Sequence, residues 1–205
     1  MSLLADLTVQ KLLNRLVAFF VVVTVHGLAL AALARLLGDS TPRHAGRLTA
    51  NPVAHTATPA LVMGLLFQLF WTPPMRIRTE NLRWGRTGLV LVAFGAFAIT
   101  LVSVPSLQWL RSSFVVQLPR TTGLALDLIL AEVQQLSLWF VALNWLPLPL
   151  LTGAYFFYAA VPKAEGVYKR HSAAFGAFLM FSIVAGWIEL GIGPVHTWLA
   201  ARLIG

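Results

Sequence analysis

The chain contains no cysteine and few charged residues. The absence of cysteine in its 205 residues excludes disulfides, thiol nucleophiles and thiolate metal ligands. Only 11% of the residues are charged, about half the fraction found in a typical soluble domain. Hydrophobic residues make up 58% of the chain, and its mean hydropathy is +0.78. We therefore expect one integral membrane domain that occupies residues 1–205.

Acidic residues are especially scarce, so the formal net charge is +8. In a soluble protein this excess would suggest binding to nucleic acid. Here the basic residues lie in the polar segments between apolar runs, where such residues fix membrane topology and contact anionic lipid headgroups. No separate basic face is evident, so we expect membrane lipids as partners and no nucleic acid.

Five apolar stretches predict the membrane-embedded segments. The uncharged runs at residues 16–34 and 87–109 are long enough to cross a bilayer as helices. Residues 136–160, interrupted by two prolines, and residues 172–188 favour two more spans. Residues 57–71 form a shorter run, either a tilted span or a re-entrant helix. We expect an all-α integral membrane protein with about five transmembrane helices, and short membrane-associated β pieces near residues 47–49 and 76–78.

The basic residues give an expected orientation for five spans. If every run crosses and the N-terminus lies inside, nine basic residues are cytoplasmic and six lie outside. The positive-inside rule then favours this orientation. The count changes if residues 57–71 do not cross.

The most specific pattern lies between residues 25 and 55. The first apolar run contains the segment His-Gly-Leu-Ala-Leu at residues 26–30, and a Gly-Asp-Ser-Thr turn follows at residues 38–41. A second polar piece, Ala-Gly-Arg-Leu-Thr-Ala-Asn-Pro at residues 45–52, leads to His55. Two later segments complete the pattern, at residues 74–91 and, as Leu-Asn-Trp-Leu-Pro-Leu-Pro-Leu-Leu-Thr-Gly, at residues 143–153.

In this order and with these gaps, the segments resemble the site-2 protease family of intramembrane zinc proteases. That family has an HExxH helix, then a loop of the form GDPTARRAGRLTLNPLAH, and later the sequence FNLLPIPPLDG. The resemblance covers nearly the whole chain and implies a transmembrane fold like that of the family.

The departures from the family pattern fall on its chemistry. In the family, the two histidines of HExxH and the Asp of LDG bind zinc, and the Glu activates water. Here His26 remains, whereas Gly27, Leu30 and Thr152 take the places of the Glu, the second His and the Asp. Ile99 takes the place of a family Asn in the middle span. A catalytic zinc site needs about three protein ligands, so we expect no zinc, no other cofactor and no catalytic residue.

His26 itself has two interpretations. It is either a neutral histidine hydrogen-bonded inside the bundle, to Thr24 or Thr152, or the axial ligand of a haem or chlorin. The residues favour the first interpretation and leave the second open.

Retained loops without metal ligands predict binding rather than cleavage. We expect a non-catalytic site-2 protease homologue, a pseudoprotease that serves as an accessory, binding or assembly subunit in a hetero-oligomeric complex of transmembrane proteins in the bacterial inner membrane. Two alternatives remain: an active intramembrane metalloprotease with unconventional ligands, and a haem- or chlorin-binding membrane protein that uses His26. The candidate partner-binding residues are Asn144, Pro147, Pro149, Gly153 and Gly176.

Overall fold

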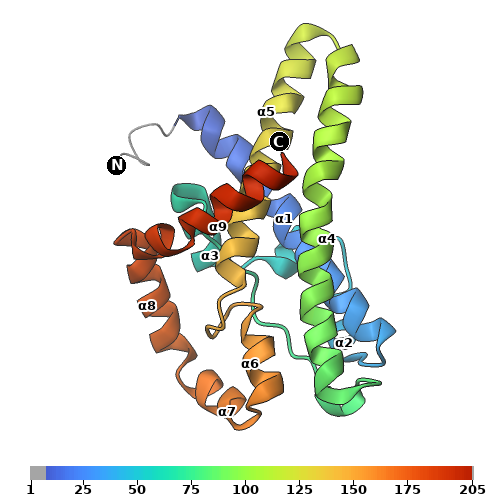
Figure 1. Cartoon of the computed structure of the whole chain (residues 1–205), viewed down its shortest axis with the longest axis vertical. Coiled ribbons are helices and arrows are strands. Elements are labelled where there is room, and N and C mark those ends of the chain that lie inside the picture. Colours follow the sequence, from blue (N-terminus) through green and yellow to red (C-terminus); the bar gives the residue numbers. More distant parts are fainter. Residues whose placement is uncertain (1–7, 205) are drawn as a thin grey trace.

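Three long helices form the body of the molecule. The computed structural model describes residues 8–204, and every regular element in that range is a helix. The long helices are α1 (Val9–Leu36), α4 (Gly85–Ser113) and α5 (Arg120–Asn144), each apolar and long enough to cross a membrane. Helices α4 and α5 lie side by side, and α1 packs obliquely against both (Figure 1). The chain is therefore an integral membrane protein built around three packed helices.

Shorter elements cover the ends and one side of this body (Figure 1). Helices α8 (Ser172–Val184) and α9 (Trp187–Leu203) meet at an angle of 73° and are together long enough for a fourth, broken span. The remaining elements are α2 (Thr41–His44), α3 (Thr58–Phe67), α6 (Ala154–Ala160), α7 (Lys163–Arg170) and the 3₁₀ turns η1 (Pro52–His55), η2 (Thr79–Asn81) and η3 (Val115–Gln117).

The expected five spans are too many, because residues 57–71 do not cross. Helix α3 has only 10 residues, about 15 Å of helix against a hydrocarbon core of about 30 Å. It ends at Gln68, which has a left-handed backbone with φ of 62°. Beyond that residue the chain continues without regular structure to η2. The last part of the apolar run, residues 69–71, is buried in the core, whereas α3 itself is half-buried or exposed along most of its length.

The expected span at residues 136–160 has the wrong limits. Helix α5 starts at Arg120 and stops at Asn144. Its first half contains Asp127 and Glu132, whose charges are paired with Arg111 (2.8 Å) and Arg15 (3.1 Å) on neighbouring helices. Cross-helix pairing makes these carboxylates compatible with a span. The two prolines after residue 145 prevent the helix from continuing.

The expected β pieces at residues 47–49 and 76–78 are wrong, since neither segment is a strand. The backbone N–H and C=O groups of a strand are hydrogen-bonded to a neighbouring strand. Here side chains form hydrogen bonds with the backbone of residues 75 and 78 instead. The Tyr155 hydroxyl accepts a hydrogen bond from the Met75 N–H (3.1 Å) and donates to the Met75 carbonyl (2.6 Å). The carboxylate of Asp39 accepts from the backbone N–H of Arg78 (2.8 Å).

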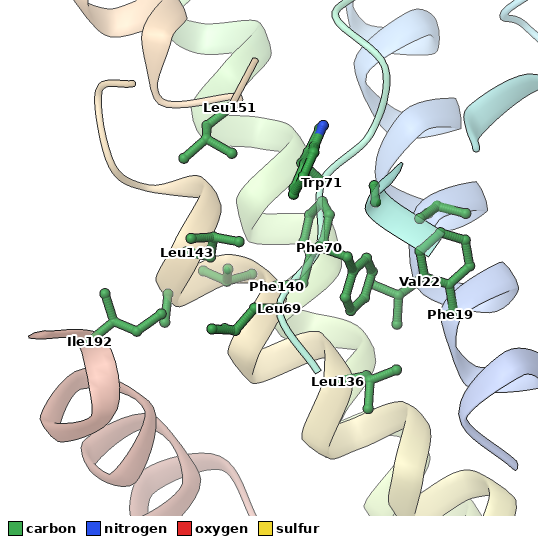
Figure 2. Packing of buried hydrophobic residues seen from close by; sticks show 14 of the residues in the cluster. Phe19, Val22, Leu69, Phe70, Trp71, Leu136, Phe140, Leu143, Leu151 and Ile192 are labelled. Atoms are coloured by element: carbon green, nitrogen blue, oxygen red, sulfur yellow. The ribbon is translucent and has the colours of Figure 1, made fainter. Parts of the chain in front are cut away.

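The main core forms where residues 69–71 pass between α1 and α5. Figure 2 shows Phe70 between Phe19 of α1 and Phe140 of α5, with ring centroids 4.9 and 5.2 Å apart. Non-helical backbone at this depth must be satisfied within the protein. The Asn144 amide provides this by donating to the carbonyl of Phe70 (2.9 Å) and to that of Phe140 (2.8 Å).

Asp39 ties together the polar loops at the far end of α1. Its fully buried carboxylate accepts hydrogen bonds from the backbone and hydroxyl of Thr41 (3.0 and 2.6 Å), from the Asn81 amide (3.1 Å) and from the Arg78 backbone. Burial acts to raise the pKa of Asp39, but these hydrogen bonds outweigh it and lower the pKa below its usual value. The ionised carboxylate therefore stabilises the fold.

Substitution of Asp39 by Asn tests this contribution. We expect the change to lower the free energy of unfolding by about 2–4 kcal/mol at pH 6, since it removes a charged acceptor from buried donors. Because the folded pKa is depressed, the stabilisation is present above about pH 4 and declines as the pH falls through the folded pKa. Thermal unfolding in detergent at several pH values measures both effects. The exposed Glu80→Gln is the control, and an equal loss in both variants would contradict the role of Asp39.

The basic residues concentrate at one end of the long helices. Ten lie in the elements around the C-terminal end of α1 and the start of α4, against four at the opposite end of the spans (Figure 1). The ten are Arg35, Arg43, Arg47, Arg76, Arg78, Arg83, Arg86, Lys163, Lys169 and Arg170; the four are Lys11, Arg15, Arg111 and Arg120, and the fifteenth basic residue, Arg202, lies in the last turn of α9. With α3 not crossing, the positive-inside rule reverses the orientation expected from five spans.

We therefore expect the N-terminal end of α1 to face away from the cytoplasm. The cysteine-free chain allows a direct measurement with single cysteines at two exposed positions, Ala45→Cys at the basic end and Thr121→Cys at the other. A membrane-impermeant maleimide should label residue 121 in intact cells and residue 45 only after permeabilisation. The reverse pattern would restore the orientation with the N-terminus inside.

Candidate functional site

His26 lies at the centre of the bundle, on the buried face of α1. Residues 22, 23, 26, 27 and 30 of this helix are all buried, which is the spacing of one helical face. The imidazole is fully buried and packs between Phe97 of α4 (centroid distance 5.3 Å) and Phe140 of α5 (4.7 Å). Three spans thus hold this ring in place.

Both ring nitrogens of His26 are hydrogen-bonded to threonine hydroxyls. Nδ1 lies 3.0 Å from Oγ1 of Thr100, and Nε2 lies 2.9 Å from Oγ1 of Thr152. The Thr100 hydroxyl donates its own proton to the carbonyl of Ala96 (2.8 Å), so its oxygen accepts from Nδ1–H. Burial between two phenylalanine rings favours the neutral imidazole. In that form Nε2 accepts from the Thr152 hydroxyl, so the ring has one defined tautomer and no free nitrogen.

These contacts decide between the partners expected from the sequence. Thr152 is confirmed, whereas Thr24 instead donates to the carbonyl of Phe20 in its own helix (2.6 Å). Thr100 was not anticipated, because Ile99 had been matched to the family Asn. Ile99 is 44% exposed, and its neighbour Thr100 is the residue that faces His26. The rotation of α4 about its axis determines which of residues 99 and 100 faces His26, and the match to the family sequence does not determine that rotation.

His55 occupies the space that a side chain at position 27 would need. An added Cβ on Gly27 would lie 2.2 Å from Nδ1 of His55. The sequence places these residues 28 positions apart, but η1 packs against α1 and brings the His55 ring onto the helix next to His26. Two sequence features together could have indicated this contact: the glycine at position 27 of the helix and the histidine at position 55, at the end of the polar loop.

His55 is a neutral and incompletely bonded group. Its Nε2 donates to the carbonyl of Thr49 (2.9 Å), which leaves Nδ1 as the unprotonated nitrogen. Nδ1 is buried against Gly27 and has no hydrogen-bond partner in the part of the chain that the structure describes. Burial lowers the pKa of His55, the hydrogen bond to Thr49 opposes that effect, and the charge of Arg47 adds to it.

The positions that the resemblance assigns to zinc do not fit that metal. Leu30 is buried but has no donor atom, the Thr152 hydroxyl already bonds the imidazole, and His26 offers no free nitrogen. Within residues 8–204, no three His, Cys, Asp or Glu side chains lie close enough to hold a metal ion together. Zinc needs about three such ligands at this kind of site.

The segment at residues 145–153 folds back onto the end of α5. The Gly153 N–H donates to the carbonyl of Asn144 (2.7 Å), and an added Cβ on Gly153 would lie 2.4 Å from the carbonyl oxygens of Trp145 and Leu146. Leu150 completes the turn with a positive φ of 76°. This close approach requires glycine at position 153.

The five candidate partner-binding residues are placed differently from one another. Asn144, Gly153 and Gly176 are buried in contacts within the chain, the last with its Cα facing Leu150. Pro149 is also buried, whereas Pro147 is exposed. Partner binding by these residues stays a prediction, and only Pro147 has the exposure that a direct contact needs.

Comparison with known proteins agrees with the resemblance. Over 173 residues the chain is 26% identical to "Putative zinc metalloprotease YwhC" from Bacillus subtilis (strain 168), covering 78% of this chain and 74% of that protein. No family model matches the sequence, and no solved structure matches it. The similarity supports a relation to the site-2 protease family, a membrane protease-like group.

Removing either hydroxyl that bonds His26 should destabilise the bundle. We expect Thr152→Val and Thr100→Val each to lower the free energy of unfolding by about 1–3 kcal/mol, because each leaves a buried imidazole nitrogen unpaired. Thr24→Val is the matched control on the same helix as His26, and it should change stability by less than about 0.5 kcal/mol. Thermal or denaturant unfolding in detergent measures the difference. Equal effects at positions 24 and 152 would contradict the hydrogen-bond chain.

Proposed function

We propose that the chain is a non-catalytic member of the site-2 protease family that binds another membrane protein as an accessory or assembly subunit. The observation that carries this proposal is the state of His26, whose two nitrogens are bonded to Thr100 and Thr152. At the position where the family holds a reactive metal, this chain has a closed set of hydrogen bonds. Such a set holds α1, α4 and the segment at residues 145–153 together and offers no group for hydrolysis.

The surroundings of His55 and Gly27 support the same proposal. In the family a Glu at position 27 activates water, and a carboxylate there would collide with the imidazole of His55. The base is thus replaced by a packed contact between η1 and α1. The polar loop that carries His55 keeps a structural part in this fold.

A membrane-facing groove provides room for a partner. A cavity of about 620 Å³ opens between α1, α4 and α5, and Thr100 lies in its wall next to Val25. Small side chains continue the wall: Ser103, Ser106 and Ser137, whose hydroxyls all donate to carbonyls of their own helices. Small residues with satisfied polar groups allow another helix to approach closely in a bilayer. We propose that a transmembrane helix of the partner packs here.

The two alternatives are less well supported by the geometry. A haem or chlorin would need a free nitrogen on His26, so both bonds to threonine would compete with its ligation. An active metalloprotease would need other ligands near His26, and among the described residues no three His, Cys, Asp or Glu side chains lie close enough to hold a metal ion together. The similarity to a protein from Bacillus subtilis is the reason to propose the cytoplasmic membrane of a bacterium as the location.

The test is co-purification from native membranes in mild detergent. We expect a second membrane protein in stoichiometric amount with the natural chain. Ser103→Trp fills the groove and should reduce the recovered partner by about tenfold or more, since a lost close helix contact of this kind costs about 1–2 kcal/mol. Val102→Trp is the matched control, because Val102 is the adjacent residue, is 63% exposed and lies outside the groove.

Three results would contradict the proposal. The first is a chain that migrates alone, with nothing bound in stoichiometric amount. The second is equal loss of partner in both tryptophan variants. The third is elemental analysis with about one zinc per chain that disappears in His26→Ala, which would favour an active metalloprotease instead.

A further inference from the structure

A second cavity lies at the basic end of the molecule, away from His26. It has a volume of about 420 Å³ and is enclosed by the irregular segment before η2, the first turns of α4, and helices α6 and α7. Figure 1 shows these elements gathered at the end of the bundle that also carries α2. The volume is within the range of cavities that hold small molecules.

Four donor groups on the wall of this cavity are free. They are the guanidinium groups of Arg76 and Arg86 and the hydroxyls of Tyr158 and Tyr168. In the part of the chain that the structure describes, none of these groups has a hydrogen-bond or ion-pair partner in the protein. The two tyrosine rings contact each other edge to face, with centroids 5.5 Å apart, which fixes both hydroxyls near the cavity.

The charge of the wall is positive overall. Its carboxylate, Glu165, already accepts a hydrogen bond from Nζ of Lys169 at 2.6 Å. Among the residues that the structure describes, the two arginines therefore have no neutralising partner. Ile77 and Leu89 are buried and supply an apolar part of the same wall. The cavity thus combines cationic donors on one side with apolar surface on another.

We propose that this cavity binds a phosphate ester carried on a small apolar or aromatic body. The planar fork of arginine matches phosphate oxygens in pairs, and tyrosine hydroxyls donate to the remaining oxygens. The apolar wall then receives the body that carries the phosphate. Two sources have this chemistry: the headgroup of an anionic phospholipid at the membrane surface, and a soluble organic phosphate. The proposal does not depend on the proposed function at the His26 site.

Calorimetric titration of the full chain in a neutral detergent tests the proposal. One arm uses dihexanoyl phosphatidic acid with dihexanoylglycerol as the ligand that lacks phosphate. The other arm uses AMP with adenosine as its counterpart. We expect binding of at least one phosphate ligand, and binding of its counterpart at least about tenfold weaker, since each charged hydrogen bond lost costs about one such factor. Binding in the first arm alone identifies the lipid source, and binding in the second identifies the soluble source.

Three double variants test whether the cavity is a built site, and the two arginine pairs separate it from general charge. Arg76→Gln with Arg86→Gln should weaken phosphate binding by about tenfold or more. Arg78→Gln with Arg83→Gln removes the same charge from exposed residues of the same connector outside the cavity, and it should change the affinity by less than about twofold. Tyr158→Phe with Tyr168→Phe should also weaken binding while keeping the rings. The proposal fails if no phosphate ligand binds, or if both arginine pairs weaken binding equally.

Discussion

The structure depends on satisfying backbone groups that lie inside the bundle without belonging to a helix. Residues 69–71 pass through the main core, where water cannot pair with their carbonyls. One amide, that of Asn144, bonds both the Phe70 carbonyl of this segment and the Phe140 carbonyl of α5. Helix α5 therefore ends at Asn144, the residue whose side chain holds the segment that passes through the core. The same principle operates at Met75, whose N–H and carbonyl are both bonded by the Tyr155 hydroxyl.

Charged groups in the spans follow a related logic. Arg15 and Glu132 pair across α1 and α5, and Arg15 also donates to the carbonyl of Leu65 at the end of α3 (2.9 Å). Arg111 bonds Asp127 and the buried amide of Gln134. Each carboxylate thus has an arginine from another helix, which reduces the cost of burying it. These pairs fix how α1, α4 and α5 are rotated and shifted relative to one another.

The sequence was sufficient for the features that depend on composition and run length. It predicted a predominantly helical membrane protein and the spans around residues 16–34 and 87–109, and it named Thr152 as one of two alternative partners of His26. It was insufficient where a contact between distant segments decides the outcome. The run at residues 57–71 has the hydropathy of a span but divides into the short helix α3 and a segment that enters the core, and α5 has charges that only cross-helix pairing explains. Thr100 and His55 were missed for the same reason, because their place beside His26 depends on helix rotation and loop packing.

The contact between Gly27 and His55 has a consequence for how this chain could change over time. The imidazole fills the volume that the first carbon of any side chain at position 27 would take. A carboxylate could return to that position only if residue 55 were first replaced by a smaller residue or its loop were moved. Residues 27 and 55 are thus coupled, and the effect of a substitution at one depends on the residue at the other. To regain the Glu of the protease motif at position 27, the chain would first need a change at or near His55. A single substitution of Gly27 by Glu would not be accommodated.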